Sequence, residues 1–263
     1  MTPILLKGAG RMGGALIAGW RRAGVFPASQ ILISDPSPGP EAEAAVREGA
    51  RLNPPDAELS EARTVMFMVK PQIWRQAAAE LAPHLAADAI VVSVAAGVAS
   101  ADLQAALGRP VARVMPTTAA AIGAGTASLF ASDPEARARA RALFEPVGAV
   151  IDLDDEDLMH AATAVSGSSP AYLYAFIEAL EAAGATVGLS ASASRNLARQ
   201  TITGAAALLR LSGEDPAALR TQVTSPGGTT AAALSVLMGP EGLGPLLEKA
   251  VRAATQRSRE LGQ

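Results

Sequence analysis

The sequence contains no cysteine. Disulfide bonds, thiol catalysis and cysteine-ligated zinc or iron–sulfur centres are therefore excluded. There are only two histidines, His84 and His160, and they do not have the close spacing that is typical of a histidine metal site. We expect no metal, and redox chemistry would need a bound organic cofactor.

Aromatic side chains are scarce, at 3% of the 263 residues, and the formal net charge is −3. A nucleic-acid surface needs clustered basic residues and stacking rings, so no nucleic-acid partner is expected. No apolar run reaches the roughly 18 to 20 residues of a membrane span, and the start of the sequence has no signal-peptide pattern. These features predict a cytoplasmic protein that does not bind membranes and acts on a small molecule.

Short apolar runs alternate with alanine-rich helical stretches in the first part of the chain. Continuous apolar strands separated by helices are typical of a parallel sheet covered on both faces. We therefore predict an α/β domain with a Rossmann-type doubly wound sheet. Its expected strands lie at residues 4–6, 31–33, 65–69, 90–94, 111–115 and 147–151.

The pattern changes after the acidic run at 152–157, beyond which no strand signal returns. This run is either a divalent-metal site or the beginning of a helix, where carboxylates are favoured by the helix dipole, and we favour the second interpretation. The division predicts a dinucleotide-binding domain at 1–155 and an all-α domain at 156–263. The helices of the all-α domain are expected at 169–187, 192–211, 215–222, 229–238 and 243–261.

A glycine motif directly follows the first predicted strand and opens a helix. In this motif Gly8 allows a tight turn, Gly10 lets the backbone approach a pyrophosphate, and Gly13 lets the helix pack on the strand. The N–H groups of the helix start then face the phosphates. This strand–turn–helix context predicts a dinucleotide site that includes Gly8, Gly10, Arg11, Met12 and Gly13.

An acidic residue, Asp35, ends the second predicted strand, where the dinucleotide fingerprint has a ribose-binding carboxylate. Asp35 would repel a 2′-phosphate, which favours NADH, whereas Ser34 and Ser37 could hydrogen-bond such a phosphate. Both NADPH and NADH therefore stay open as the cofactor.

Two further strand ends are expected at the cleft, because open α/β sheets bind ligands at the carboxyl ends of their strands. They are Val69-Lys70-Pro71, and the turn that contains Ala95 and Gly97. Lys70 is one of only three lysines. It is either a solvated loop charge or a contact to cofactor or substrate.

Ser225, Gly227, Gly228, Thr229 and Thr230 directly precede or begin a predicted helix. Free backbone N–H groups and hydroxyls at this place would form a receptor for a carboxylate, although an ordinary capped helix start has the same pattern.

The helix at 170–187 is apolar over most of its circumference, which suggests a subunit interface.

Taken in order, these segments resemble the pyrroline-5-carboxylate reductase family over nearly the whole chain. Two segments are specific to that family, the run from Val223 to Thr230 and the closing helix from Ala254 to Leu261. The resemblance implies reduction of L-1-pyrroline-5-carboxylate to L-proline by NAD(P)H, the last step of proline biosynthesis. It also implies a homodimer formed through the helical domain, with a higher oligomer left open.

The same resemblance implies roles for individual residues. Ser225, Gly227, Gly228, Thr229 and Thr230 would hold the substrate carboxylate, with the Thr230 hydroxyl near the ring nitrogen, while Lys70 and the 93–97 turn would border the nicotinamide. Thr230 and Lys70 are thus the predicted catalytic residues. The chain departs from the family at Thr117, where an asparagine is usual, and at Ala119, where a proline is usual, which puts cofactor affinity in doubt.

Two other functions fit the same architecture. The first is a reductase of a hydroxy acid or of another cyclic imine, but hydroxy-acid reductases commonly use a lysine on the first long helix of the second domain, and residues 164–211 contain none. The second is a regulatory protein that binds a dinucleotide without turnover, as suggested by the changed loop at 116–119.

Overall fold

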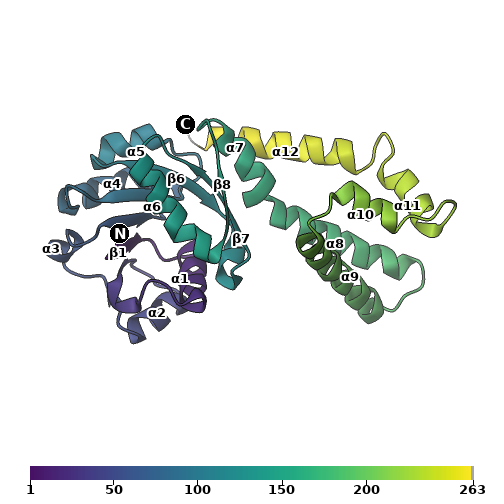
Figure 1. The fold of residues 1–263 in the computed structure, drawn as a ribbon, viewed down its shortest axis with the longest axis horizontal. Helices are drawn as coiled ribbons and strands as arrows, with labels where there is room; N and C mark the ends of the chain where they lie inside the picture. Colours follow the sequence, from purple (N-terminus) through teal and green to yellow (C-terminus); the bar gives the residue numbers. More distant parts are fainter. Residues whose placement is uncertain (262–263) are drawn as a thin grey trace. The chain divides into compact units, whose positions relative to one another are not determined.

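The computed structural model describes residues 1–261 and divides into two compact units (Figure 1). The first unit comprises Met1–Gly167 together with the residues from Ala253 onwards, and the second comprises Ser168–Arg252. The first unit holds the sheet and the second is helical.

The described part of the first unit forms one eight-stranded sheet in the order β3-β2-β1-β4-β5-β6-β7-β8. Neighbouring strands are parallel except for β6 and β7, so β7 and β8 run opposite to the others. The doubly wound α/β fold is confirmed. The predicted strand at 147–151 forms β8, and the prediction that it runs parallel to the first strands is wrong, while β3 and β7 were not predicted. Only residues 117–124 join β6 to β7, too few for the crossover that a parallel pair requires. The strands are β1 Ile4–Lys7, β2 Ile31–Ser34, β3 Arg51–Leu52, β4 Thr64–Phe67, β5 Ile90–Ser93, β6 Val111–Pro116, β7 Gly125–Phe130 and β8 Gly148–Asp152.

Helices cover both faces of the sheet because its central strands are apolar on both sides. In β1, Ile4 and Leu6 pack on one face and Leu5 on the other, and all three are fully buried. The first face carries α1 (Arg11–Ala23), α2 (Pro40–Arg47) and α6 (Pro134–Phe144). The second carries α3 (Asp56–Leu59), α4 (Trp74–Leu81) and α5 (Ser100–Leu107).

The second unit consists of helices whose ends agree with the predicted ends to within one residue. Side-chain caps explain two of the starts: the Ser190 hydroxyl accepts from the Ala193 N–H, and Asp215 accepts from the Ala217 N–H. Within the described residues, no helix is long and apolar enough to cross a membrane. The helices are α8 Ser169–Thr186, α9 Ala191–Ser212, α10 Pro216–Gln222, α11 Thr229–Leu237 and α12 Leu243–Glu260, whose last residues belong to the first unit.

The segment between β8 and α8 packs with the sheet. It forms α7 (Leu158–Ala162) and a π-helical turn (Thr163–Gly167), in which Met159 and Ala164 are fully buried. The first compact unit therefore extends beyond residue 155, where the first domain was predicted to end. The roles assigned to residues 1–155 and 156–263 stay predictions.

Candidate dinucleotide and substrate sites

The loop between β1 and α1 needs glycine at two positions. Gly8 has a φ of +96°, and a Cβ there would lie 2.7 Å from the Met68 carbonyl oxygen. A Cβ on Gly13 would lie 3.0 Å from the Gly8 carbonyl oxygen, so α1 packs closely on the loop. Gly10 is different, because no atom lies within 4 Å of the position of its Cβ. Gly10 therefore borders open space.

That open space is a groove of about 570 Å³, lined among others by Gly10, Arg11, Ser37 and Thr118. Gly10 is the N-cap residue of α1, and the first turn of the helix carries no acidic side chain. The first N–H groups of a helix have no partner within it and attract anions. The groove and the helix start fit the pyrophosphate of a dinucleotide.

Asp35 connects the glycine loop to the segment after β2. One carboxylate oxygen accepts from the Ala9 N–H at 2.5 Å, and the other accepts from the Ser37 N–H at 2.7 Å. Asn53 pairs with the backbone N–H and carbonyl of Asp35. Because a carboxylate can accept about four hydrogen bonds, each oxygen of Asp35 can take another donor. Ser34 lies beside it, and its hydroxyl accepts from Lys7 at 3.4 Å.

The ends of β4 and β5 lie beside the end of β1, since Lys7 pairs in register with Phe67, and Phe67 with Ser93. The structure thus brings Val69, Lys70, Pro71, Ala95 and Gly97 to the same edge of the sheet as the glycine loop. Lys70 is exposed, whereas Ala95 and Gly97 are buried, and Gly97 has a φ of +80°.

The sequence analysis missed a partly buried polar cluster next to the β5–α5 turn. Glu156 accepts from the Ser100 N–H at 2.7 Å, from the Ser100 hydroxyl at 2.6 Å and from Arg113 at 3.0 Å. His160 follows on α7, and its Nδ1 lies 3.0 Å from the Ser258 hydroxyl oxygen. Burial lowers the pKa of His160, and the positive charges of Arg113 and Arg259 lower it further. One signal was available, the single arginine within the apolar strand at 111–115.

The first residue of the acidic run at 152–157 also pairs with arginine side chains. Asp152 forms ion pairs with Arg137, at 3.2 Å, and with Arg141.

In the loop at 116–119, the Thr117 hydroxyl accepts from the Thr126 N–H at 3.0 Å. This hydroxyl therefore links η4 (Thr118–Ile122) to β7.

The predicted carboxylate receptor lies in the second unit, at the start of α11. Gly227 has a φ of +69°, and the Gly228 N–H donates to the Ser225 carbonyl at 3.0 Å, which forms a tight turn. Gly228 is the N-cap residue and supplies no side-chain cap, so N–H groups of Thr229 and Thr230 lack an acceptor within the helix. Thr230 is half-buried and Ser225 is exposed.

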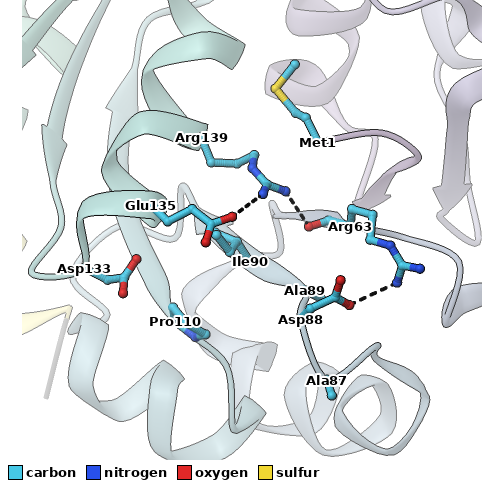
Figure 2. Close-up of a pocket in the computed structure, with 10 residues that line it drawn as sticks. All are labelled: Met1, Arg63, Ala87, Asp88, Ala89, Ile90, Pro110, Asp133, Glu135 and Arg139. Atoms are coloured by element: carbon cyan, nitrogen blue, oxygen red, sulfur yellow. Dashed lines mark hydrogen bonds and ion pairs between the residues drawn. The ribbon is translucent and has the colours of Figure 1, made fainter.

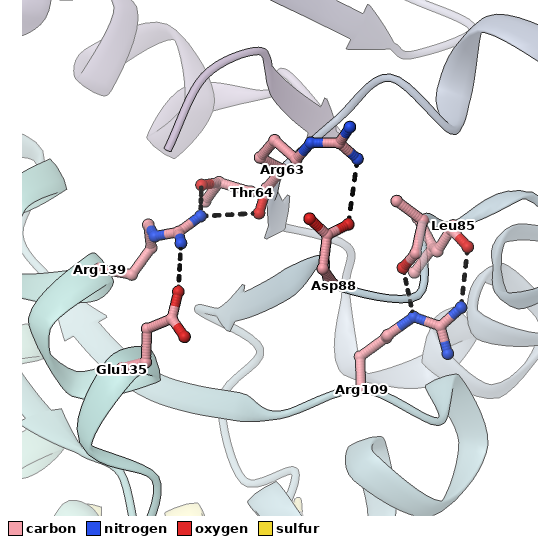
Figure 3. Close-up of polar contacts among 8 residues, drawn as sticks. Arg63, Thr64, Leu85, Asp88, Arg109, Glu135 and Arg139 are labelled. Atoms are coloured by element: carbon pink, nitrogen blue, oxygen red, sulfur yellow. Dashed lines mark hydrogen bonds and ion pairs between the residues drawn. The ribbon is translucent and has the colours of Figure 1, made fainter.

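A second cavity, of about 580 Å³, lies at the opposite edge of the sheet, next to the starts of β4, β5 and β6 (Figure 2). Four of its charged side chains form two pairs: Arg63 donates to Asp88, and Arg139 to Glu135. Figure 3 shows that Arg139 also donates to the Arg63 carbonyl and to the Thr64 hydroxyl. This cavity lies away from the carboxyl ends of the strands and shares no residue with the glycine loop.

Comparisons with known proteins match both parts of the chain to family models. Residues 4–97 match the family model described as NADP oxidoreductase coenzyme F420-dependent, and residues 156–261 match that of pyrroline-5-carboxylate reductase dimerisation. Pyrroline-5-carboxylate reductase of Pseudomonas aeruginosa is 41% identical over all of this chain and 98% of its own length.

Two solved structures extend this likeness to three dimensions. A pyrroline-5-carboxylate reductase from Coxiella burnetii is 31% identical and superimposes with a TM-score of 0.90 over 100% of this chain and 99% of that one. The Plasmodium falciparum pyrroline carboxylate reductase with NADP bound is 27% identical, with a TM-score of 0.84 over 99% and 98%. Sequence, fold and the order of the motifs therefore agree, and this chain belongs to the pyrroline-5-carboxylate reductase family.

Proposed function

We propose that the carboxyl edge of the sheet binds NADPH or NADH, from which this chain, an oxidoreductase of the family named above, takes the hydride that reduces L-1-pyrroline-5-carboxylate to L-proline. This reaction is the last step of proline biosynthesis. The observation that carries the proposal is the groove beside Gly10, where the first N–H groups of α1 border open space.

Gly8, Gly10, Arg11, Met12 and Gly13 are the proposed pyrophosphate site, because they form the loop and the first turn of α1. Ser34 and Asp35 lie beside this loop, and we assign them to the adenine ribose. The Asp35 carboxylate favours a free ribose diol, while the hydroxyls of Ser34 and Ser37 could donate to a 2′-phosphate. NADP is the ligand of the Plasmodium falciparum relative, so both dinucleotides remain candidates for this chain.

The nicotinamide is assigned to the neighbouring strand ends, with Val69, Lys70 and Pro71 on one side and Ala95 and Gly97 on the other. The register of β1, β4 and β5 supports this assignment, since it aligns all three ends on one edge. Lys70 is exposed there and brings a positive charge to this edge of the sheet.

The start of α11 is the proposed site of the substrate carboxylate. Ser225, Gly227, Gly228, Thr229 and Thr230 offer hydroxyls and free backbone N–H groups, and the positive end of the helix dipole favours an anion. The Thr230 hydroxyl is assigned to the ring nitrogen. The position of Thr230 in the first turn of α11, where the residue is half-buried, supports this role.

The chemistry requires little from acids or bases. The reduced nicotinamide supplies a hydride to the imine carbon, and the electron pair of the C=N bond moves to the nitrogen. A protonated imine is already a strong hydride acceptor, so the task of Thr230 and Lys70 is to hold and orient it.

A homodimer through the second unit explains why its helices expose so many apolar side chains. No residue of α8 or α11 is buried, and Tyr174, Leu197, Leu211 and Val236 are all more than half exposed. Large apolar patches mark interaction sites. A higher oligomer and a cytoplasmic location stay predictions.

The test is the decrease in absorbance at the reduced-nicotinamide band when the protein is mixed with pyrroline-5-carboxylate and either NADPH or NADH. Oxidation that depends on the imine is the expected result, and the two rates rank the cofactors. Dinucleotide binding without oxidation would contradict the proposal and favour another substrate or a regulatory role.

A further inference from the structure

We propose that Glu156 is a positioning residue for hydride transfer. Glu156 holds the turn at 95–99 in place by accepting hydrogen bonds from Ser100. The Glu156 carboxylate is itself held by a hydrogen bond from Arg113. The proposal rests on the proposed function, which places this turn beside the nicotinamide.

Glu156 acts as the cap that α5 lacks in its own sequence. The helix begins at Ser100, and the N-cap residue is Ala99, whose side chain cannot accept a hydrogen bond. Glu156, which is 56 residues further along the chain, accepts from both the N–H and the hydroxyl of Ser100. Its negative charge is also favoured at the positive end of the helix dipole. The turn therefore ends on a carboxylate that belongs to another segment.

The other end of the same turn is held by the sheet. The Ser93 hydroxyl, at the end of β5, accepts from the Ala95 N–H at 3.2 Å, and the Val98 N–H donates to the Ala95 carbonyl at 3.4 Å. Gly97 supplies the positive φ that closes the turn. Removal of Glu156 would free one end only, so we expect the turn to shift rather than to unfold.

Arg113 holds the Glu156 carboxylate in one position. It lies on β6, in register with Ser93, and its side chain is 3% exposed. Only Nη1 is paired, with Glu156, while Nε and Nη2 are buried without a partner in the described part of the chain. A buried ion pair commonly adds little stability compared with apolar residues. A charge kept here at such a cost fits a role in fixing geometry.

The first variant is Glu156→Gln, which keeps the size of the side chain and one accepting oxygen. Because a displacement of about 1 Å can cost roughly 100-fold in rate, we expect kcat to fall by about tenfold. The primary isotope effect with 4-deuterated reduced cofactor should increase, since hydride transfer becomes slower than product release. The dissociation constant of ADP-ribose, which lacks the nicotinamide, should change by less than about twofold.

Ser100→Ala is the milder second variant, because it removes the hydroxyl and keeps the N–H. We expect a smaller fall in kcat, and a double variant whose effect is less than the product of the two single effects. Glu145→Gln is the matched control, because Glu145 forms an exposed ion pair with Arg141 and its segment packs on the opposite face of the sheet from α5. The kcat of this variant should be unchanged.

Unchanged kcat in both Glu156→Gln and Ser100→Ala would overturn the proposal. So would a loss of ADP-ribose affinity in proportion to kcat, because that result means general damage to the first unit. If the unaltered protein shows no imine-dependent oxidation, the proposed function itself fails, and this outcome is separate from either result with the variants.

Discussion

The carboxylate of Asp35 accepts a hydrogen bond from the backbone N–H of Ala9, inside the glycine loop, at 2.5 Å. The residue at the end of β2 thus holds the loop at the end of β1. Its other oxygen holds the Ser37 N–H in the same way. Asp35 therefore braces the loop, and we propose that the same side chain also binds the ribose.

Asp35→Ala tests both roles. Loss of the bond to the Ala9 N–H should lower the affinity for NADH and NADPH alike. Loss of the ribose acceptor should lower the affinity for NADH further. One charge-assisted hydrogen bond contributes roughly 1.5 to 3 kcal/mol, so we expect the affinity for NADH to fall by at least about tenfold. Fluorescence titration of each dinucleotide measures this effect. An unchanged NADH-to-NADPH ratio would remove Asp35 from the ribose site.

Gly8 and Gly10 should respond differently to alanine. Gly8→Ala forces a side chain into positive φ and against the Met68 carbonyl, so we expect a loss of at least about 1 to 3 kcal/mol in the free energy of unfolding.

Gly10→Ala should leave stability nearly unchanged, because φ is −66° and no atom lies near the new Cβ. Its dinucleotide affinity should nevertheless fall, since the methyl group would stand where the pyrophosphate approaches. Urea unfolding and dinucleotide titration of both variants separate the two effects. Full affinity in Gly10→Ala would place the cofactor elsewhere.

Thr230→Ala should impair imine reduction and leave the affinity for the cofactor unchanged. We expect kcat/KM for pyrroline-5-carboxylate to fall by about tenfold, the value of one hydrogen bond to a charged group. The dissociation constant of the dinucleotide should stay the same. Thr221→Ala is the control, because the Thr221 hydroxyl donates only to the Ala217 carbonyl within α10. Equal losses of substrate and cofactor affinity in Thr230→Ala would contradict the separate roles.

The lowered pKa of His160 predicts a pH dependence of stability. Its folded pKa lies below the ordinary value of 6.5, so the unfolded chain binds this proton more tightly. The stability due to neutral His160 is complete above pH 6.5 and is lost as the pH falls through the folded pKa. His160→Gln should therefore lose less stability on acidification, as measured by urea midpoints over a pH series. Equally steep curves would rule out His160 as the source.

Much of the fold could be predicted because its signals are local. The central strands are short apolar runs, and the helices of the second unit have clear turns between them. β7 was missed because its residues, Gly125-Thr126-Ala127-Ser128-Leu129-Phe130, begin with small and polar side chains and form no apolar run. The direction of β7 depends on a short connection, which strand patterns do not report.

The candidate sites divide in the same way. The glycine loop and the α11 start are continuous motifs, so the sequence was sufficient to find them. The cluster of Ser100, Arg113 and Glu156 joins three separate segments, and only the structure shows that they meet. The brace between Asp35 and Ala9 is similar, since spacing predicted a ribose contact but not a bond to the loop.

The last turns of α12 belong to the first unit, where Ser258 meets His160, although the second unit lies between these residues in the chain. In order of synthesis, the second unit is therefore an insertion within the first. The Rossmann-type unit cannot make these contacts until the chain has been synthesised beyond Ser258. A fragment that stops at Gly167 would lack this closing segment, so the two halves of the protein cannot be separated by a single cut.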